Sequence, residues 1–324
     1  KKLFTLFSVA AFSFAFSQIQ RVEPSFWWKG MKNPKLQILV YGKNIAQYQV
    51  ELSDKIEVKE VKKVENPNYL FVTVNTNEIN TSKFKINLKN KGKTVYSYNY
   101  ELKDRKEGSE DRASYSSKDV FYLIMPDRFA NGNPNNDTMP GLTEKANRNL
   151  PNGRHGGDLR GIINNLDYLK DLGATALWLT PANEDNEDNT TYHGYAQTDL
   201  YKLDPRYGTN EEYIELSKEL QKRDMKLVMD YVTNHWGSKH WLIQDLPTKD
   251  WIHWFDEGKN GFARSNYKTT AQVDTNASEI DKKYALNGWF DTTMPDLNQA
   301  NPLVLKYLTQ NAIWWIEYAD LGGF

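Results

Sequence analysis

Short segments in which apolar and polar residues alternate fill the N-terminal part of the chain. Alternation with a period of two is typical of strands that bury one face. Turn-forming residues, such as those at 66–68 and 90–92, separate the segments, which are residues 36–41, 49–52, 70–74, 84–88 and 95–100. We therefore predict a small antiparallel β-sandwich over residues 19–102.

A polar segment follows, and the periodicity changes after it. Residues 103–118 are rich in Lys, Glu, Ser and Asp, a composition that predicts a linker between two domains. Continuous apolar segments after the linker predict buried strands at residues 120–125, 174–179 and 227–229. Apolar residues at helical spacing predict helices at residues 159–172, 211–223 and 302–321. Strands that alternate with helices form parallel βαβ units.

These units favour an α/β fold, an incomplete (β/α)8 TIM barrel over residues 119–324. Polar residues such as Asp230 follow the strands directly, where the active sites of such barrels lie. A doubly wound sheet is the alternative, but no glycine-rich phosphate turn follows the first strand. About three and a half units are visible, with a fourth strand beginning at residues 322–324, whereas a whole barrel takes roughly 250 residues.

The segment between the third strand and the last helix is too long for an ordinary βα loop of about 2 to 6 residues. We predict an inserted subdomain over about residues 236–300. Its aromatic residues can stack on the apolar faces of sugar rings or simply form the core of the subdomain. They are Trp236, Trp241, Trp251, Trp254, Phe255, Trp289 and Phe290.

The N-terminus has the pattern of a secretory signal peptide. Lys1 and Lys2 precede an apolar run over residues 3–16, and small residues at Ala15 and Ser17 predict cleavage before Gln18. The run is shorter than the about 20 residues that span a membrane. We expect residues 1–17 to be removed and the protein to be periplasmic or extracellular, without a membrane anchor.

Charge and cysteine content exclude several classes of partner and site. The net charge of −1, with interspersed Lys and Glu, provides no field that would attract nucleic acid, so we expect no such partner. The sequence contains no Cys, which excludes disulfides, thiol catalysis and thiolate metal sites. Any metal ligand must therefore be oxygen or imidazole.

Five polar motifs follow one another in the second part of the chain. They are residues 125–137, residues 155–158, residues 192–195 with Asp199 and residues 204–208, residues 230–235, and residues 294–298. In this order they resemble the α-amylase superfamily, glycoside hydrolase family 13, and within it the secreted neopullulanase- and cyclomaltodextrinase-like enzymes of Bacteroidetes. The resemblance covers residues 119–324, and the N-terminal sandwich is similar to the accessory domain of those enzymes.

The resemblance implies a retaining glycosidase that acts on α-glucans such as starch and maltodextrins. An Asp attacks the anomeric carbon and a Glu protonates the leaving oxygen, with the two carboxyl groups about 5 to 5.5 Å apart. In the family the nucleophile lies just after a Gly-Phe-Arg sequence on the fourth strand. Phe324 is the last residue here, so we expect the catalytic carboxylates beyond it and none within the chain.

The resemblance also assigns five residues of the substrate site. Asp230 and His235 correspond to residues that support the arginine beside the nucleophile and bind sugar hydroxyls, and Asn234 orients their loop. His193 is expected to bind a hydroxyl, and Tyr195 to place its ring under the sugar by apolar stacking. The alternatives are a structural Asp230, satisfied core histidines and a packed rim tyrosine.

A calcium site is expected in the loop after the first strand. The loop gathers amide and carboxylate oxygens, the ligands that Ca²⁺ prefers, and it closely matches the family's calcium site. The expected ligands are Asn131, Asn133, Asn136, Asp137, the Gly156 carbonyl and Asp158. An Asn-rich turn with side chain to backbone hydrogen bonds is the alternative.

Substrate preference and catalytic status leave further alternatives. Asp296 stands where the neopullulanase pattern usually has Lys, so α-1,4 cleavage is expected while activity on α-1,6 branches or cyclic dextrins stays open. Transglycosylation is possible on the same fold. A noncatalytic starch-binding protein is another candidate, motivated by the Trp27-Trp28 pair.

Overall fold

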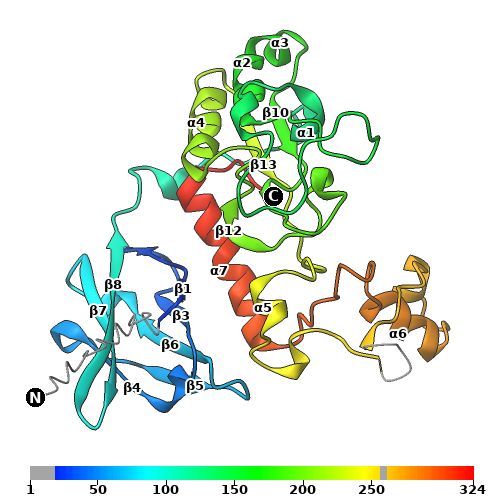
Figure 1. Cartoon of the computed structure of the whole chain (residues 1–324). Helices are drawn as coiled ribbons and strands as arrows, with labels where there is room; N and C mark the ends of the chain where they lie inside the picture. Colours follow the sequence, from blue (N-terminus) through cyan, green and yellow to red (C-terminus); the bar gives the residue numbers. More distant parts are fainter. Residues whose placement is uncertain (1–18, 256–260) are drawn as a thin grey trace, which may run out of the picture. The chain divides into compact units, whose positions relative to one another are not determined.

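The computed structural model of the chain describes residues 19–255 and 261–324 (Figure 1). The predicted signal peptide lies outside the described residues. The described residues form two compact units. The first contains residues 19–25, 33–63 and 67–101, and the second contains residues 26–32, 64–66 and 102–324.

Two four-stranded sheets make up the N-terminal sandwich, which confirms the predicted fold of this region. One sheet has the order β1 (Arg21–Glu23), β3 (Lys35–Tyr41), β6 (Tyr69–Asn75), β5 (Glu60–Lys63). The other has the order β2 (Trp27–Trp28), β8 (Lys93–Lys103), β7 (Lys83–Asn90), β4 (Gln49–Leu52). The short strands β1, β2 and β5 were not predicted. The sandwich is also not wholly antiparallel, because β2 pairs with β8 in parallel.

Alternation of buried and exposed side chains explains the sandwich. In β7, Phe84, Ile86 and Leu88 are buried while Lys83 and Lys85 are exposed. Strands β3 and β6 pair from Lys35 opposite Asn75 to Tyr41 opposite Tyr69. The side chains on their inner face therefore form a continuous apolar layer.

A parallel sheet lies at the centre of the second unit, with the order β13 (Lys226–Met229), β10 (Ala176–Leu179), β9 (Phe121–Ile124). A parallel bridge joins Val228 to Gly323, where the Met229 N–H donates to the Gly323 carbonyl at 3.1 Å. The start of a fourth strand, expected at residues 322–324, thus lies beside β13. The order of the strands is that of successive βα units of a barrel.

Helices connect these strands. They are α1 (Pro126–Phe129), α2 (Leu159–Asn164), α3 (Leu166–Asp171), α4 (Asn210–Gln221), α5 (Trp241–Gln244), α6 (Glu279–Asn287) and α7 (Pro302–Ala319). The helix predicted at 159–172 is divided at Asn165, whose φ of −115° and ψ of 16° are not helical. A capping box of Thr209 and Glu212 begins α4. Two further strands, β11 (Asn183–Glu184) and β12 (Asp199–Leu203), form an antiparallel pair.

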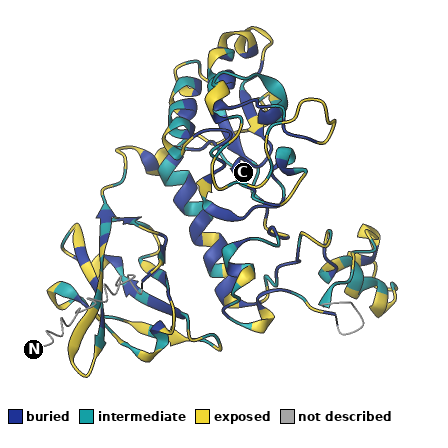
Figure 2. Ribbon diagram, viewed as in Figure 1, coloured by how far each residue is buried: buried dark blue, intermediate teal, exposed yellow. Residues whose placement is uncertain are grey.

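Residues 121–124 form a strand as predicted, but the prediction that this strand is buried was wrong. Val120, Phe121 and Leu123 are 56%, 40% and 54% exposed, and Trp178 of β10 is 39% exposed. Ile124 and Leu179 are buried, as are nine of the 18 residues of α7, which is largely dark blue and teal in Figure 2. β9 is an edge strand, and within the described residues only one face of this sheet is fully covered.

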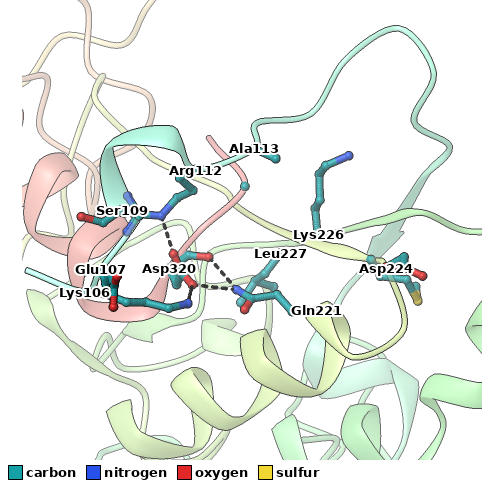
Figure 3. A pocket seen from close by; sticks show the side chains of 13 residues that line it. Lys106, Glu107, Ser109, Arg112, Ala113, Gln221, Asp224, Lys226, Leu227 and Asp320 are labelled. Carbon is teal, nitrogen blue, oxygen red and sulfur yellow. Dashed lines mark hydrogen bonds and ion pairs between the residues drawn. The ribbon is translucent and has the colours of Figure 1, made fainter.

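The segment predicted as a linker contacts the end of α7 within the second unit. Arg105 forms an ion pair with Glu317 at 3.0 Å, and Arg112 and Lys106 both pair with Asp320 (Figure 3). Asp320 has a left-handed φ of 55° and ends α7, and its side chain also accepts a hydrogen bond from Gln221 of α4. Part of residues 103–118 is therefore packed instead of running free.

The inserted segment carries little regular structure besides α5 and α6. Trp236, Trp251 and Phe255 are almost completely buried and form its core. Trp254 and Phe290 are 46% and 47% exposed. Most of the predicted aromatic cluster therefore serves packing, and only a minority of its rings is open to a ligand. Across residues 19–255 and 261–324, none of the helices combines the length and the apolar character that crossing a bilayer requires.

Candidate functional site

Asp230 follows β13 directly, and two neutral donors hold its carboxylate. The Tyr195 hydroxyl donates to Oδ2 of Asp230 at 2.9 Å, and the indole N–H of Trp178 donates to the same oxygen at 3.0 Å. Trp178 lies in β10, which pairs with β13. The carboxylate thus connects the ends of two strands with the segment that carries Tyr195.

Tyr195 keeps its proton in this arrangement. Burial, together with the neighbouring Asp230 carboxylate, raises the pKa of Tyr195 to about 12. The hydroxyl is therefore a permanent donor to Asp230 near neutral pH, and this hydrogen bond fixes the ring. The Tyr195 and His193 rings lie 5.8 Å apart.

His193 ends the short helix η6 (Thr191–His193) and has a defined tautomer. Its Nδ1 accepts a hydrogen bond from the Tyr195 backbone N–H at 2.9 Å, so the proton of the neutral ring lies on Nε2. Burial lowers the pKa of His193, which favours this neutral form. The Nε2–H group is the donor that the ring can offer to a ligand.

His235 is buried and uses both ring nitrogens within the protein. Its Nε2 lies 3.1 Å from the Tyr195 carbonyl, which can only accept, and its Nδ1 lies 3.2 Å from the Asn234 amide nitrogen, which can only donate. The ring is therefore neutral with its proton on Nε2, and burial lowers the pKa of His235 to about 4. This arrangement favours a role in holding Tyr195 and Asn234 over the expected hydroxyl binding.

Four of the five expected substrate residues line one cavity of about 570 Å³, a size suited to a small ligand. They are His193, Tyr195, Asn234 and His235. Asp230 is one hydrogen bond behind Tyr195. The residues singled out in the sequence are thus brought together around a common hollow.

The inserted subdomain provides the rest of the wall, largely with residues that the sequence analysis missed. Phe290 stacks on His235 with ring centroids 5.3 Å apart and an interplanar angle of 25°. Tyr267, Leu286 and Met294 also line the cavity. Phe290 belonged to the aromatic set noted in the sequence, whereas Tyr267 lies in a polar stretch whose pattern gave no signal.

Asp296, which stands where the neopullulanase pattern usually has Lys, has a hydrogen-bonding partner. Its Oδ2 lies 2.7 Å from Nδ1 of His253, and the carboxyl is 2% exposed. Burial raises the pKa of Asp296, although the His253 hydrogen bond opposes the shift. An antiparallel bridge joins Asp296 to His235, so this pair fixes the backbone beside the cavity.

Two of the expected calcium ligands serve other roles. The Asp158 carboxylate accepts hydrogen bonds from the N–H groups of Gly132, Asn133 and Gly161, the last at 2.6 Å, and caps α2. Asn133 Oδ1 accepts from the Asn135 N–H. These oxygens shape the loop, as the Asn-rich turn alternative expects.

Other oxygens of the loop are open to a cation. Asn131 Oδ1 and Asn136 Oδ1 are buried and have no hydrogen-bond partner. Asn131 donates its amide to Asp137 at 2.7 Å, and Gly156, at φ +83°, lies so close to Asp137 that a Cβ would be 2.6 Å from its carboxylate oxygen. In the described part of the chain no group of three or more His, Cys, Asp or Glu could hold a metal, so amide oxygens must supply such a site.

The Trp27-Trp28 pair, which motivated the starch-binding alternative, is buried. Trp27 and Trp28 are 3% and 5% exposed. The Trp28 ring packs against Phe26 and Trp314, with centroids 5.3 and 6.3 Å away. This pair fills a core and presents no surface to a polysaccharide.

We predict that His235 makes stability fall on acidification. The unfolded chain binds a proton near the ordinary pKa of 6.5, while the folded chain does so only near 4, so the free energy of unfolding decreases as pH falls between these values. From pH 7 to pH 5 this loss amounts to about 2 kcal/mol.

The measurement is urea unfolding of the wild type and His235→Gln at both pH values. Gln can still donate to the Tyr195 carbonyl and accept from Asn234 but cannot be protonated, so the decrease should be smaller in this variant. An equal decrease in both proteins would contradict the assignment.

Comparisons with known proteins agree with this geometry. The profile of the alpha amylase catalytic domain matches residues 123–324, and that of the cyclomaltodextrinase N-terminal domain matches residues 21–106. A cyclomaltodextrinase of Geobacillus thermopakistaniensis is 33% identical over 212 residues, which are 63% of this chain and 32% of that protein. Neopullulanase 2 of Thermoactinomyces vulgaris is 34% identical over 215 residues, 63% of this chain and 32% of that protein.

The solved structure of an Anoxybacillus alpha-amylase superposes with a TM-score of 0.51 at 38% identity, covering 63% of this chain and 39% of that one. Among the curated relatives that it matches, the chain spans about a third of their length. The catalytic-domain profile covers well over half of the 324 residues. The barrel order, the strand-end residues and this match together establish that the chain belongs to the alpha-amylase family of glycosidases.

Proposed function

We propose that this chain is part of a retaining α-glucan hydrolase that cleaves α-1,4 bonds in starch or maltodextrins. The observation that carries the proposal is the cavity at the strand ends, where His193, Tyr195 and His235 meet and Asp230 anchors Tyr195. Relatives named cyclomaltodextrinase, neopullulanase and maltogenic amylase support it.

The chain's own residues would bind and orient the sugar. The Nε2–H of His193 donates to a hydroxyl, and the Tyr195 ring, fixed by Asp230, stacks on the apolar face of the ring. His235 stays neutral and holds the Tyr195 carbonyl and the Asn234 amide in place. None of these groups has to change its protonation state when a neutral sugar binds.

The reacting carboxylates belong, in this proposal, to residues after Phe324. The relatives are about three times as long as the matched region, which supports further chain. Phe121, Leu123 and Trp178 give one face of the parallel sheet an exposed apolar surface, which further strands of a closed barrel would bury. The nucleophile would attack the anomeric carbon while the acid protonates the leaving oxygen.

The binding part of the proposal predicts that the 324-residue chain binds maltotriose and that His193→Ala weakens the affinity roughly tenfold. Loss of one well-placed hydrogen bond accounts for a change of this size. Isothermal titration measures it. Tyr168→Ala is the matched control, because Tyr168 is 57% exposed on α3 and does not line the cavity.

The full-length gene product should release reducing sugar from maltodextrin, and this chain should not. Hydrolysis by the chain at the rate of the full-length protein would overturn the placement of the carboxylates. Absence of maltotriose binding, or equal binding by His193→Ala, would overturn the role of the cavity.

We also propose that the loop after β9 binds calcium, with Asn131, Asn136 and Asp137 as side-chain ligands and the Gly156 carbonyl beside them. The two buried, unpartnered amide oxygens support this smaller set. Asp158 and Asn133 would shape the loop instead of coordinating. The ion would neutralise the Asp137 carboxylate and hold the loop.

If the loop binds calcium, the protein should have a higher melting temperature in about 1 mM calcium than in the presence of a chelator, because an ion that binds only the folded state stabilises it. The shift should amount to a few degrees and should disappear in Asp137→Asn. Differential scanning calorimetry measures both proteins. An identical melting temperature with calcium and with chelator in the wild type would contradict the site.

Export is proposed from the sequence alone, since residues 1–17 lie outside the described residues. The basic pair Lys1-Lys2 and the apolar run that follows support a cleaved signal peptide. N-terminal sequencing of the protein recovered from the periplasm or medium should begin at Gln18. Recovery of an uncleaved chain in the cytosol would contradict export.

A further inference from the structure

The turn that carries His193 and Tyr195 is held weakly by its own sequence. The helix η6 lies between two left-handed residues, Thr190 at φ 61° and Gly194 at φ 76°, and the Thr190 side chain does not cap it. A β-branched residue such as Thr190 rarely adopts this φ, and such strain persists only where the surroundings enforce it. The groups that hold the turn must therefore come from other segments.

Two charged side chains bind all three polar groups of Thr191, the first residue of η6. The Glu144 carboxylate accepts hydrogen bonds from the Thr191 N–H and from the Thr191 hydroxyl, both at 2.7 Å. Nη1 of Arg154 donates to the Thr191 carbonyl and to the hydroxyl oxygen, both at 3.2 Å. Thr191 is almost completely buried. Groups from outside the turn therefore fix the beginning of η6.

The Thr191 carbonyl is also the point where the turn closes. It accepts a hydrogen bond from the Gly194 N–H at 3.1 Å. Directly after this bond, the Tyr195 N–H donates to Nδ1 of His193, the contact that fixes the tautomer of the ring. A displaced Thr191 carbonyl would therefore disturb the His193 ring and the Tyr195 backbone together.

The Arg154 side chain makes no other hydrogen bond with the described residues. It is almost completely buried, and its Nε and Nη2 have no hydrogen-bond partner. The carboxylates of Asp127 and Asp204 lie 3.7 and 3.5 Å from the guanidinium. They balance its charge, but the directed contacts of Arg154 all go to Thr191.

Both carboxylates already have closer donors. Asp127 accepts from two backbone N–H groups, the nearer at 2.8 Å, and Asp204 accepts from the Arg206 guanidinium at 2.6 Å. Burial of a cation is costly, and apolar side chains of similar volume are often as stable in such a place. Stabilisation of the fold therefore does not account for Arg154, whereas its two contacts with Thr191 do.

Tyr207 supports this arrangement. Its ring lies 4.5 Å from the Arg154 guanidinium, and its hydroxyl donates to the Tyr192 carbonyl at 2.7 Å. Tyr207 is itself buried. Arg154 and Tyr207 thus hold two consecutive carbonyls of η6, those of Thr191 and Tyr192.

We propose that Arg154 is a positioning residue of the sugar site. Through Thr191 it fixes the turn that presents the Nε2–H of His193 and the ring of Tyr195 to the ligand. Arg154 does not line the cavity of about 570 Å³, so it acts without touching the sugar. Its effect on sugar binding rests on the proposed function, whereas its effect on the His193 ring does not.

The first test observes the His193 ring without a ligand. Long-range ¹H–¹⁵N correlation spectra at neutral pH show which ring nitrogen carries the proton, and His193→Ala identifies the signals among the five histidines. The wild type should carry the proton on Nε2 alone. Arg154→Met, which keeps the apolar length without the donor, should show both tautomers. An unchanged His193 spectrum in this variant would overturn the proposal.

The second test measures maltotriose binding to the 324-residue chain by isothermal titration. Arg154→Met should weaken the affinity about tenfold, and Arg154→Lys, which keeps one donor for the Thr191 carbonyl, about threefold. His193→Ala is also expected to weaken it about tenfold. The double variant Arg154→Met with His193→Ala should lose about tenfold to twentyfold, instead of the about hundredfold loss expected of independent residues.

Arg148→Met is the matched control. Arg148 precedes Arg154 in the same loop, is exposed, and donates to the His155 carbonyl instead of to η6. This variant should keep the wild-type affinity and the wild-type His193 spectrum. If Arg154→Met does not fold, Arg154→Lys and Thr191→Val replace it, each with an expected loss of about threefold, because each removes part of the contact.

The outcomes separate this inference from the proposed function. Independent losses in the double variant, or equal effects of Arg148→Met and Arg154→Met, would overturn the positioning role. If His193→Ala weakens binding and the Arg154 variants do not, only this inference fails. If the wild type binds no maltotriose while Arg154→Met still changes the His193 tautomer, the proposed function fails and the positioning of His193 stands.

Discussion

The hydrogen bond between the Tyr195 hydroxyl and the Asp230 carboxylate is the interaction on which the site depends. It joins the end of β13 to the segment after η6, and Trp178 of β10 donates to the same oxygen. Three segments far apart in the chain are therefore fixed to one carboxylate. Without it, the Tyr195 backbone would still contact His193 and His235, but its side chain would lose the hydrogen bond to the end of β13.

Around this bond, burial keeps the polar groups neutral. It lowers the pKa values of His193 and His235 and raises that of Tyr195. Each ring nitrogen with a defined partner then has one possible role as donor or acceptor. A set of neutral groups with fixed donor directions suits hydroxyl-bearing ligands, since no charge has to lose its hydration when the ligand binds.

The sequence predicted what depends on periodicity and on motifs. The sandwich strands and the βα order could be predicted from periodicity, and the cluster of His193, Tyr195 and His235 from the resemblance of its motifs to the family. Tyr267 and the pairing of His253 with Asp296 could not, because both depend on how a long irregular insertion folds back. The exposure of Phe121 and Leu123 was also missed, since an apolar run does not reveal which face is covered.

The end of α7 has a consequence for strand alignment. Asp320, tied to Arg112, Lys106 and Gln221, turns the chain so that Gly323 meets Val228 and the Phe324 ring contacts Tyr231 at 5.1 Å. A shift by one residue would reverse the direction of each side chain. A shift that brought Phe324 to the position of Gly323 would also place a Cβ 2.6 Å from the Tyr115 ring. The ion pairs of Asp320 lie at the end of the sheet opposite the sugar cavity. They thus protect the alignment of the strand that begins at residues 322–324.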